Sequence, residues 1–220
     1  MSVAIKMCGI TRVQDAQDAV SCGAAILGLN FYSGSPRCIA LEQAQQIAES
    51  VAGRVKLAGV FVNMNVAEVL RIARAVPLDL VQLHGSEPLA ECQAIAAEFE
   101  VIRALKMDAA FNPADAARFA SLGGVLGGLL LDTPCDGHGG SGVSFNWTQI
   151  NWHNLRRLIA PAKLFLAGGL TAENVAEAIT QAQPDVVDVC SGIESEKGIK
   201  SLDKMREFVA AVRAAERQQV

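Results

Sequence analysis

Asp132 stands where an apolar run meets a glycine-rich segment, a setting that suits a catalytic acid. Residues 129–131 are all leucine, which is typical of a strand buried on both faces of a parallel sheet. Residues 133–142 are rich in glycine, so this segment could cover a bound molecule. We therefore predict that Asp132 is a catalytic group at a strand end, roofed by a loop. A helix-capping aspartate followed by a surface linker is the alternative.

Cys8 follows the first apolar run, residues 3–7, and could complement Asp132 in proton transfer. A lone cysteine at a strand end is commonly a small buried hydrophobic residue. As a general base it would have to be a thiolate, a form that amides arranged to bind phosphate would favour. Asp132 would act as the protonated general acid. An acid and a base that face each other across one site suit proton transfer within a single substrate.

Glycines and a serine after the last two apolar runs predict a phosphate-binding site. Gly168 and Gly169 precede a helix start, where backbone amides can approach an anion closely. Ser191 and Gly192 offer a second set of amides and a hydroxyl. Barrels commonly hold phosphate in the loops after their seventh and eighth strands. Glycines that serve only as tight turns are the alternative.

Arg37 and His84 are candidates for direct contacts with the substrate. Pro36 restricts the loop before Arg37, so the guanidinium could be positioned to bind a carboxylate through two hydrogen bonds. A solvated surface cation is the alternative for Arg37, and His84 suits a scaffold role and a substrate contact equally well. Cys135 and His138 supply only half of a metal-ligand set, so we do not predict a zinc site.

Apolar runs and helix signals alternate through the whole chain. The eight runs that we expect to form strands cover residues 3–7, 26–31, 56–62, 80–83, 101–105, 129–132, 163–167 and 186–189. We expect Thr11, Asn65, Thr171 and Ser201 to cap helices that follow them. Eight repeats predict a (β/α)8 TIM barrel, in which residues after each strand gather at one mouth. We predict one domain over residues 1–220; a doubly wound open sheet is the structural alternative.

Composition narrows the functional class. The formal net charge is −4 without a basic block, so we expect no nucleic-acid partner. The apolar stretches are shorter than the roughly 18 residues that suggest a membrane span, and no signal segment is evident. The six cysteines are scattered singly, which indicates reduced thiols. We therefore expect a cytoplasmic protein that binds neither membranes nor nucleic acid and acts on a small phosphorylated molecule.

The chain resembles the phosphoribosylanthranilate isomerase family of tryptophan biosynthesis from Lys6 to about Phe208. The segments that carry this resemblance are Lys6-Met7-Cys8-Gly9-Ile10-Thr11, Ser35-Pro36-Arg37, Gly59-Val60-Phe61-Val62-Asn63, Gln82-Leu83-His84-Gly85, Leu131-Asp132-Thr133, Gly139-Gly140-Ser141-Gly142, Ala167-Gly168-Gly169-Leu170-Thr171 and Asp188-Val189-x-Ser191-Gly192-x-Glu194. So many matches in order are specific, whereas any single one is weak. Cys190 departs from the serine that is frequent in the family.

The resemblance implies an Amadori rearrangement of N-(5-phosphoribosyl)anthranilate to 1-(2-carboxyphenylamino)-1-deoxyribulose 5-phosphate. It implies that Cys8 is the general base that removes the C2′ proton and that Asp132 is the general acid that protonates the ring oxygen. Arg37 would hold the anthranilate carboxylate, and the glycines after the seventh and eighth strands would hold the phosphate. The resemblance implies neither a metal nor an organic cofactor, and the family includes monomers and homodimers.

Two other classes of protein remain open on the residues alone. A different phosphate-binding barrel, such as indole-glycerol-phosphate synthase or a sugar-phosphate epimerase, would need a Lys and Glu set or paired metal ligands. Lys106 is available for the first, but its carboxylate partners are not evident. A catalytically silent binding barrel would have no need of Cys8, Asp132 and Arg37 together.

Overall fold

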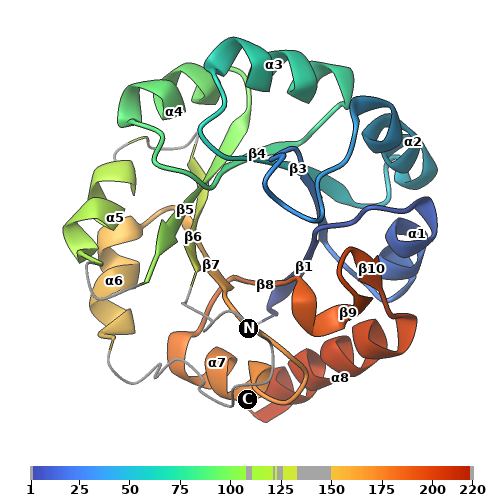
Figure 1. The fold of residues 1–220 in the computed structure, drawn as a ribbon. Coiled ribbons are helices and arrows are strands. Elements are labelled where there is room, and N and C mark those ends of the chain that lie inside the picture. The colour runs from blue at the N-terminus through green and yellow to red at the C-terminus, as the bar shows by residue number, and fades with distance from the viewer. Residues whose placement is uncertain (1, 108–110, 121, 123–125, 133–149, 219–220) are drawn as a thin grey trace.

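The computed structural model is a closed barrel of parallel strands inside a ring of helices (Figure 1). It describes all residues except 1, 108–110, 121, 123–125, 133–149 and 219–220. The barrel strands are β1 (Ala4–Cys8), β2 (Ile26–Asn30), β3 (Lys56–Phe61), β4 (Leu80–Leu83), β5 (Glu100–Lys106), β6 (Leu126–Asp132), β7 (Lys163–Ala167) and β8 (Val186–Val189). Because β8 pairs with β1, the predicted (β/α)8 barrel is confirmed and the open-sheet alternative is wrong.

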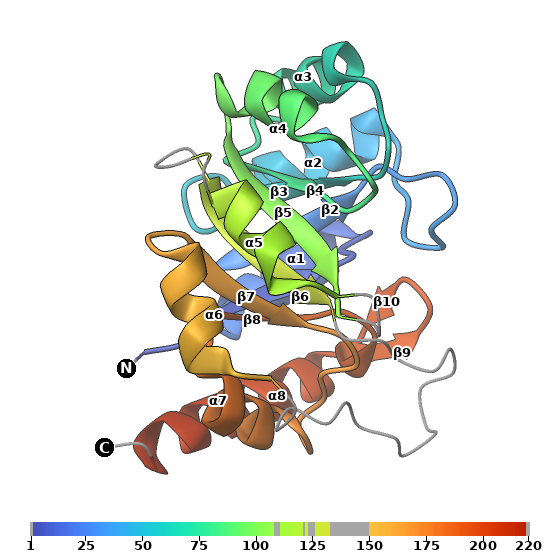
Figure 2. The same cartoon turned by 90° about the vertical axis from the view of Figure 1, so that its left-hand side faces the viewer.

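Helices alternate with these strands and cover the outside of the barrel. They are α1 (Val13–Ser21), α2 (Leu41–Val51), α3 (Val66–Ala75), α4 (Leu89–Ala96), α5 (Pro113–Ala120), α6 (Trp152–Ile159), α7 (Val175–Ala182) and α8 (Leu202–Gln218). Between β8 and α8 the chain forms the 3₁₀ helix η3 (Ser191–Ile193) and a small sheet of β9 (Glu194–Glu196) and β10 (Ile199–Lys200). Figure 2 shows β9 and β10 at the end of the barrel opposite the two chain termini.

Strand boundaries differ from the prediction chiefly at β6. This strand begins at Leu126, three residues earlier than predicted, and so includes Gly127 and Gly128. A Cβ atom at Gly128 would lie 2.4 Å from the ring of Phe165, so glycine leaves the room that this ring needs inside the barrel. A packing demand from β7, which is distant in sequence, therefore explains the glycine at position 128.

Side chains on the strands alternate between the barrel interior and the helix layer, as the two-residue period of a strand requires. The cluster inside the barrel comprises Ile26, Ala58, Leu80, Ile102, Ala104, Leu130, Phe165, Ala167 and Val186, with Ala4 packed against it. The strand residues between these positions, such as Leu27 and Leu131, point outward and belong to the larger core between the barrel and the helices. By the same period, Lys6 and Cys8 follow Ala4 on the inner face of β1.

Two of the four predicted helix caps are confirmed. The Asn65 side chain accepts a 2.9 Å hydrogen bond from the Glu68 amide at the start of α3. Ser201 accepts from the Lys204 amide at 3.4 Å, before α8. These side chains satisfy amides that the first turn of a helix leaves without a partner in the helix.

The predictions that Thr11 and Thr171 cap helices are wrong. Arg12 occupies the cap position of α1, and the Thr11 hydroxyl donates instead to the Gly198 carbonyl oxygen at 2.5 Å. Thr171 lies three residues before the cap position of α7, where Asn174 accepts a hydrogen bond from the Thr171 amide. Both threonines therefore have partners, in a distant loop or in the turn before the helix, that the local sequence did not indicate.

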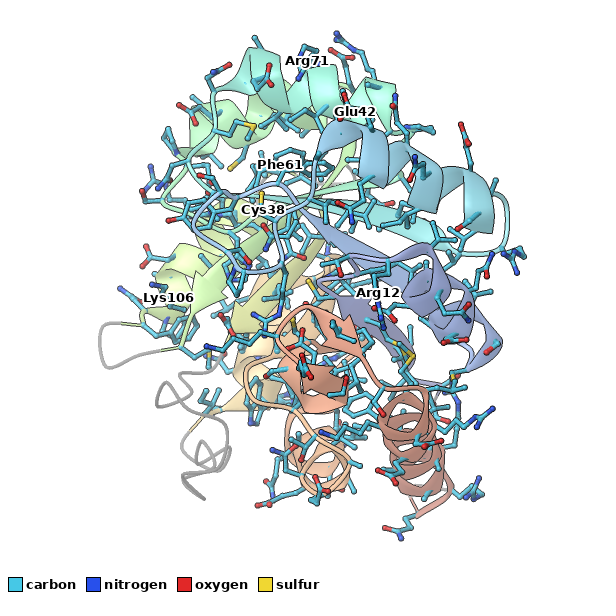
Figure 3. All side chains as sticks on the ribbon, turned by 45° about the vertical axis from the view of Figure 1, so that its right-hand side comes forward. Arg12, Cys38, Glu42, Phe61, Arg71 and Lys106 are labelled. Carbon is cyan, nitrogen blue, oxygen red and sulfur yellow. The ribbon has the colours of Figure 1, made fainter. Side chains whose placement is uncertain are left out.

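An ion pair between Lys6 and Asp188 lies inside the barrel, where β8 pairs with β1 and closes the sheet. The two residues are directly paired in the register between β1 and β8, and Lys6 Nζ lies 2.9 Å from an Asp188 carboxylate oxygen. The exposed Arg71 on α3, in contrast, projects from the outer surface (Figure 3). Burial alone would lower the pKa of Lys6, but the charges of Asp188 and Cys8 raise it above its ordinary value. Burial raises the pKa of Asp188 to about 7.

Replacing Lys6 by Met should destabilise the protein by about 3–5 kcal/mol, because it leaves a buried carboxylate without its cation. The loss should grow as pH rises. Burial raises the pKa of Asp188 and Lys6 lowers it, so without Lys6 the folded-state pKa lies further above that of the unfolded chain, and rising pH favours unfolding more in the variant than in wild type. Urea unfolding at several pH values measures both effects.

The double variant Lys6→Met/Asp188→Leu removes the pair entirely and should recover most of this stability. Arg71→Met, which breaks an exposed pair with Glu68, is the control and should cost no more than about 1 kcal/mol. Equal losses in the single and double variants would contradict the idea that unpaired charge causes the destabilisation.

Candidate active site

The predicted site residues that the structure describes lie at one end of the barrel, where the strands finish. Cys8 and Asp132 are the last residues of β1 and β6, and His84 directly follows β4. Arg37 lies in the loop after β2. The two phosphate-site candidates, 168–169 and 191–192, follow β7 and β8. Cys135, His138 and the glycine-rich segment 133–142 fall outside the described residues.

Asp132 is linked to His84 and, through it, to Gln82. His84 Nε2 lies 3.2 Å from an Asp132 carboxylate oxygen, and the Gln82 amide nitrogen lies 2.9 Å from His84 Nδ1. Because an amide nitrogen only donates, Nδ1 accepts and the ring proton of a neutral His84 sits on Nε2. His84 thus donates to Asp132, and buried Gln82 fixes the orientation of the ring.

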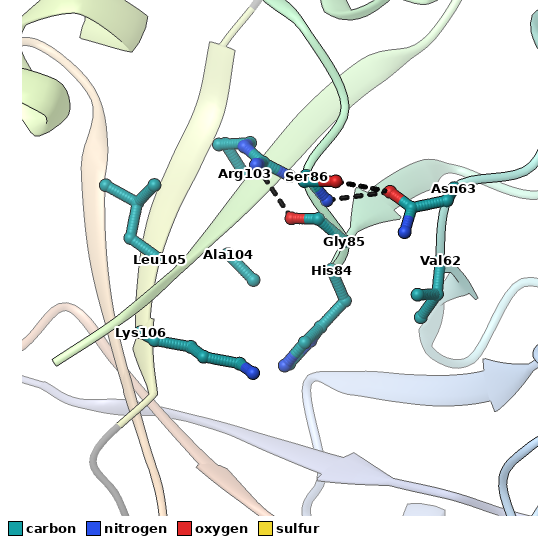
Figure 4. A pocket seen from close by; sticks show the side chains of 9 residues that line it. All are labelled: Val62, Asn63, His84, Gly85, Ser86, Arg103, Ala104, Leu105 and Lys106. Atoms are coloured by element: carbon teal, nitrogen blue, oxygen red, sulfur yellow. Dashed lines mark hydrogen bonds between the residues drawn. The ribbon is translucent and has the colours of Figure 1, made fainter. Parts of the chain in front are cut away.

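A pocket of about 400 Å³ opens beside His84 at the ends of β3, β4 and β5 (Figure 4). Its lining residues are Val62, Asn63, His84, Gly85, Ser86, Arg103, Ala104, Leu105 and Lys106. Lys106 pairs in register with Asp132 on the neighbouring strand, so the pocket adjoins the proposed acid. Its size and mixed apolar and polar walls suit a small organic molecule.

A buried network holds the two loops that form one wall of this pocket. Arg103 donates to the Glu87 carboxylate at 2.5 Å and to the Gly85 carbonyl oxygen at 2.9 Å. Glu87 in turn accepts from the amides of Asn63 and Gly85. The Asn63 side chain accepts from the Ser86 amide at 2.7 Å. The loops after β3 and β4 are thereby tied to one charged pair under the site.

The Cys8 thiol sits among cations and beside a second thiol. Cys190 donates a hydrogen bond to Cys8, and Lys6 and Lys200 are near enough for their charges to act on it. The hydrogen bond from Cys190, and the two ammonium charges, hold the pKa of Cys8 well below its ordinary value although burial opposes this. Donation to Cys8 and burial raise the pKa of Cys190 well above its ordinary value. Of the two thiols, Cys8 is therefore the one whose ionisation these surroundings favour.

Gly28 on β2 makes room for the Cys8 thiol. A Cβ atom at Gly28 would lie 2.7 Å from Cys8 Sγ and 3.1 Å from Cys8 Cα. The backbone of Cys8 is fixed by the sheet, so this clash could not be relieved by rotating the side chain alone. Gly28 thus sets the position of the thiol, as Gly128 sets that of Phe165.

Arg37 is held by a carboxylate of the chain itself. Its Nε and Nη2 atoms each lie 2.7 Å from a Glu194 oxygen. These bonds raise the pKa of Arg37 above its ordinary value. Burial alone would raise the pKa of Glu194, but the hydrogen bonds from Arg37 and Lys200 hold it below its ordinary value. The Arg37 side chain passes so close over Gly9 that a Cβ there would meet its Cδ at 2.6 Å. The guanidinium is therefore fixed next to the Cys8 turn.

The two phosphate-site candidates lie against each other. Gly168 and Gly169 adopt positive φ angles of 97° and 59°, which favour glycine. Asn174 fixes this turn, since its side chain donates to the Gly169 carbonyl oxygen at 3.0 Å. A Cβ atom at Gly192 would lie 2.0 Å from the Leu170 carbonyl oxygen, so only glycine lets the two loops approach this closely.

Within the described residues, no three His, Cys, Asp or Glu side chains gather as a metal site would require. In the same part of the chain, no helix has both the length and the apolar character needed to cross a membrane.

Comparison with known proteins points to one family. The sequence model of N-(5′-phosphoribosyl)anthranilate (PRA) isomerase matches residues 5–211. The chain belongs to the N-(5′-phosphoribosyl)anthranilate isomerase family. It is thus an enzyme, an isomerase of tryptophan biosynthesis. This membership favours the isomerase over the synthase, the epimerase and the silent barrel.

Similar members of this isomerase family span nearly the whole chain. The isomerase of Herminiimonas arsenicoxydans is 41% identical over 218 residues, which cover 96% of this chain and 93% of the relative. The crystal structure of the Thermotoga maritima isomerase has a TM-score of 0.87 at 36% identity, covering 96% of this chain and 99% of its own. The isomerase in complex with reduced 1-(o-carboxyphenylamino)-1-deoxyribulose 5-phosphate has a TM-score of 0.84 at 34% identity, with the same coverage.

Several residues that shape the isomerase site were missed in the sequence. Lys6, Arg103 and Asp188 each interrupt an apolar run, and a charge inside a strand buried on both faces needs a partner. A charged residue inside an apolar run was therefore the signal that could have identified these three residues. The partner of Arg103, Glu87, lies outside any strand and carries no comparable signal.

On the prediction that Cys8 is a catalytic group, Gly28→Ala should reduce isomerase activity about 100-fold, because it displaces the Cys8 thiol by the order of an ångström. Steady-state kinetics measure the loss, and circular dichroism should show an intact fold. Gly127→Ala is the matched control: it also adds a methyl group to a strand glycine, but there the clash is with the partly exposed side chain of Glu100. Equal activity of the two variants would show that Gly28 does not position the thiol.

Proposed function

We propose that this chain converts N-(5′-phosphoribosyl)anthranilate to 1-(2-carboxyphenylamino)-1-deoxyribulose 5-phosphate, with Cys8 as general base and Asp132 as general acid. The surroundings of the Cys8 thiol are the observation that carries the proposal, because Cys190 and the cations Lys6 and Lys200 lower its pKa and so favour the basic, thiolate form. A relative of similar fold was solved with a reduced form of this product. Asp132 stands at the same mouth of the barrel as Cys8, with β7 and β8 between their strands.

The reaction needs one proton delivered to the ring oxygen and one removed from C2′, two atoms that are both bonded to C1′. Protonation of the furanose oxygen breaks its bond to C1′ and leaves an iminium group there, which makes the C2′ hydrogen acidic. The Cys8 thiolate then removes that hydrogen to give an enol-amine, which tautomerises to the ketone. An acid and a base on separate strands can act on the two atoms without neutralising each other.

His84 supports the acid in this scheme. Its Nε2–H group points at Asp132, and Gln82 holds the ring from the other side. A carboxyl group with a fixed partner has one preferred orientation toward the ring oxygen. The adjoining pocket, lined by His84 and Lys106, offers space for the anthranilate ring.

The substrate's two anionic groups match the two remaining sets of residues. A guanidinium has five N–H donors. Two of the nitrogens of Arg37 donate hydrogen bonds to Glu194, so its other N–H groups can bind the anthranilate carboxylate. We assign the phosphate to the adjacent amides of Gly168, Gly169, Ser191 and Gly192. We further propose that residues 1–220 act as one barrel domain, as a monomer or homodimer in the cytoplasm.

Cys8→Ala and Asp132→Asn should each lower kcat by about 10²–10⁴-fold, because each removes one proton-transfer group. Phosphoribosylanthranilate made in situ is followed by its fluorescence loss, and circular dichroism checks the fold. Cys38→Ala, which changes an exposed cysteine, is the control and should match wild type. Undiminished turnover by Cys8→Ala would contradict the assignment of the base, and no turnover by wild type would contradict the reaction.

A further inference from the structure

Cys8 and Cys190 are brought side by side by the closure of the barrel. Met7 and Val189 are paired in the register of β1 and β8. Cys8 is the next residue of β1, and Cys190 directly follows the end of β8, so the two cysteines are neighbours. Adjacent strands lie about 4.7–4.9 Å apart. That spacing falls within the Cα separation of about 4.4–6.8 Å that a disulfide spans. The two thiols also affect each other's ionisation, since their interaction lowers the pKa of Cys8 and raises that of Cys190.

The surroundings of this pair suit thiol oxidation. Lys200 Nζ lies 3.7 Å from Cys190 Sγ and 2.9 Å from the Cys190 carbonyl oxygen, so a cation stands over the second thiol. Cys8 and Cys190 are both partly exposed at the barrel mouth. Oxidation-sensitive cysteines are generally thiolates that are accessible and next to a resolving thiol. The proton-transfer reaction itself requires one thiolate and gives no role to a second thiol.

We propose that Cys8 and Cys190 form a peroxide-oxidisable dithiol site, in which a hydroperoxide oxidises Cys8 and Cys190 closes a Cys8–Cys190 disulfide. The site takes a small hydroperoxide as its oxidant and a dithiol as its reductant. Its consequence for turnover rests on the proposed function, because a disulfide would remove the Cys8 thiolate that serves as base.

The chemistry balances in two steps. The Cys8 thiolate attacks one peroxide oxygen, the O–O bond breaks, and an S–O bond forms; Cys8 becomes a sulfenic acid and the second oxygen leaves as water after taking up protons. Cys190 then attacks the Cys8 sulfur and expels hydroxide, which takes the Cys190 proton and leaves as a second water. The sum is two thiols and one hydrogen peroxide giving one disulfide and two waters.

The test exposes the reduced, desalted full chain to a stoichiometric excess of hydrogen peroxide. Free thiols are then blocked, and the protein is digested without reductant for peptide mass spectrometry. We expect a peptide pair joined through Cys8 and Cys190, complete loss of turnover, and full recovery of turnover with dithiothreitol. Absence of that joined pair, or Cys8 joined to a different cysteine, would overturn the proposal.

Two variants separate this site from general oxidation. Cys190→Ser should form no such link, should give a sulfenic acid on Cys8 that dimedone traps, and should lose recovery with dithiothreitol as Cys8 oxidises further. Cys92→Ser, which changes a buried cysteine, should behave like wild type in the disulfide assay. Equal recovery of Cys190→Ser and wild type would overturn the proposal. If the link forms but Cys8→Ala proves fully active, the proposed function fails and the dithiol site stands.

Discussion

The balance of charge around the Cys8 thiol is the constraint on which the rest of the site depends. Among the residues that the structure describes, the ionised groups that gather there are the cations Lys6, Arg37 and Lys200 and the carboxylates Asp188 and Glu194. Three positive charges face two negative ones, so a thiolate on Cys8 neutralises the cluster. Protonation of Asp188 would only increase the excess positive charge. A thiol in this position is therefore driven toward the form that a general base requires.

The barrel topology produces this cluster from residues far apart in the chain. Closure of β8 onto β1 pairs Lys6 with Asp188 and places Cys190 beside Cys8. The small sheet after β8 folds Glu194 and Lys200 over the same turn. Gly28 leaves the space into which the Cys8 thiol projects. The same backbone closure that completes the fold thus assembles the surroundings of the proposed base.

The strands and the main candidates could be predicted because their signals are local. Apolar runs marked the eight strands, and polar residues at their ends marked Cys8, His84 and Asp132 at one mouth. The partner of each charged side chain depends on the strand register and on the closure of the barrel. The pairing of Lys6 with Asp188 and that of Arg37 with Glu194 therefore could not be predicted from the sequence. The misplaced caps at Thr11 and Thr171 have the same origin, since their partners come from outside the expected first turn.

The pH dependence of Cys8 alkylation tests the central claim most directly. Iodoacetamide reacts with thiolates, so the rate rises with pH through the thiol pKa and then levels off, and peptide mass spectrometry follows Cys8 separately from the other cysteines. The account predicts a midpoint well below the value of about 8.5 for a free cysteine. We also expect a higher midpoint in Lys6→Met, which removes a cation that lowers the pKa of Cys8 and keeps the Asp188 carboxylate. A wild-type midpoint at or above the free-cysteine value would contradict it.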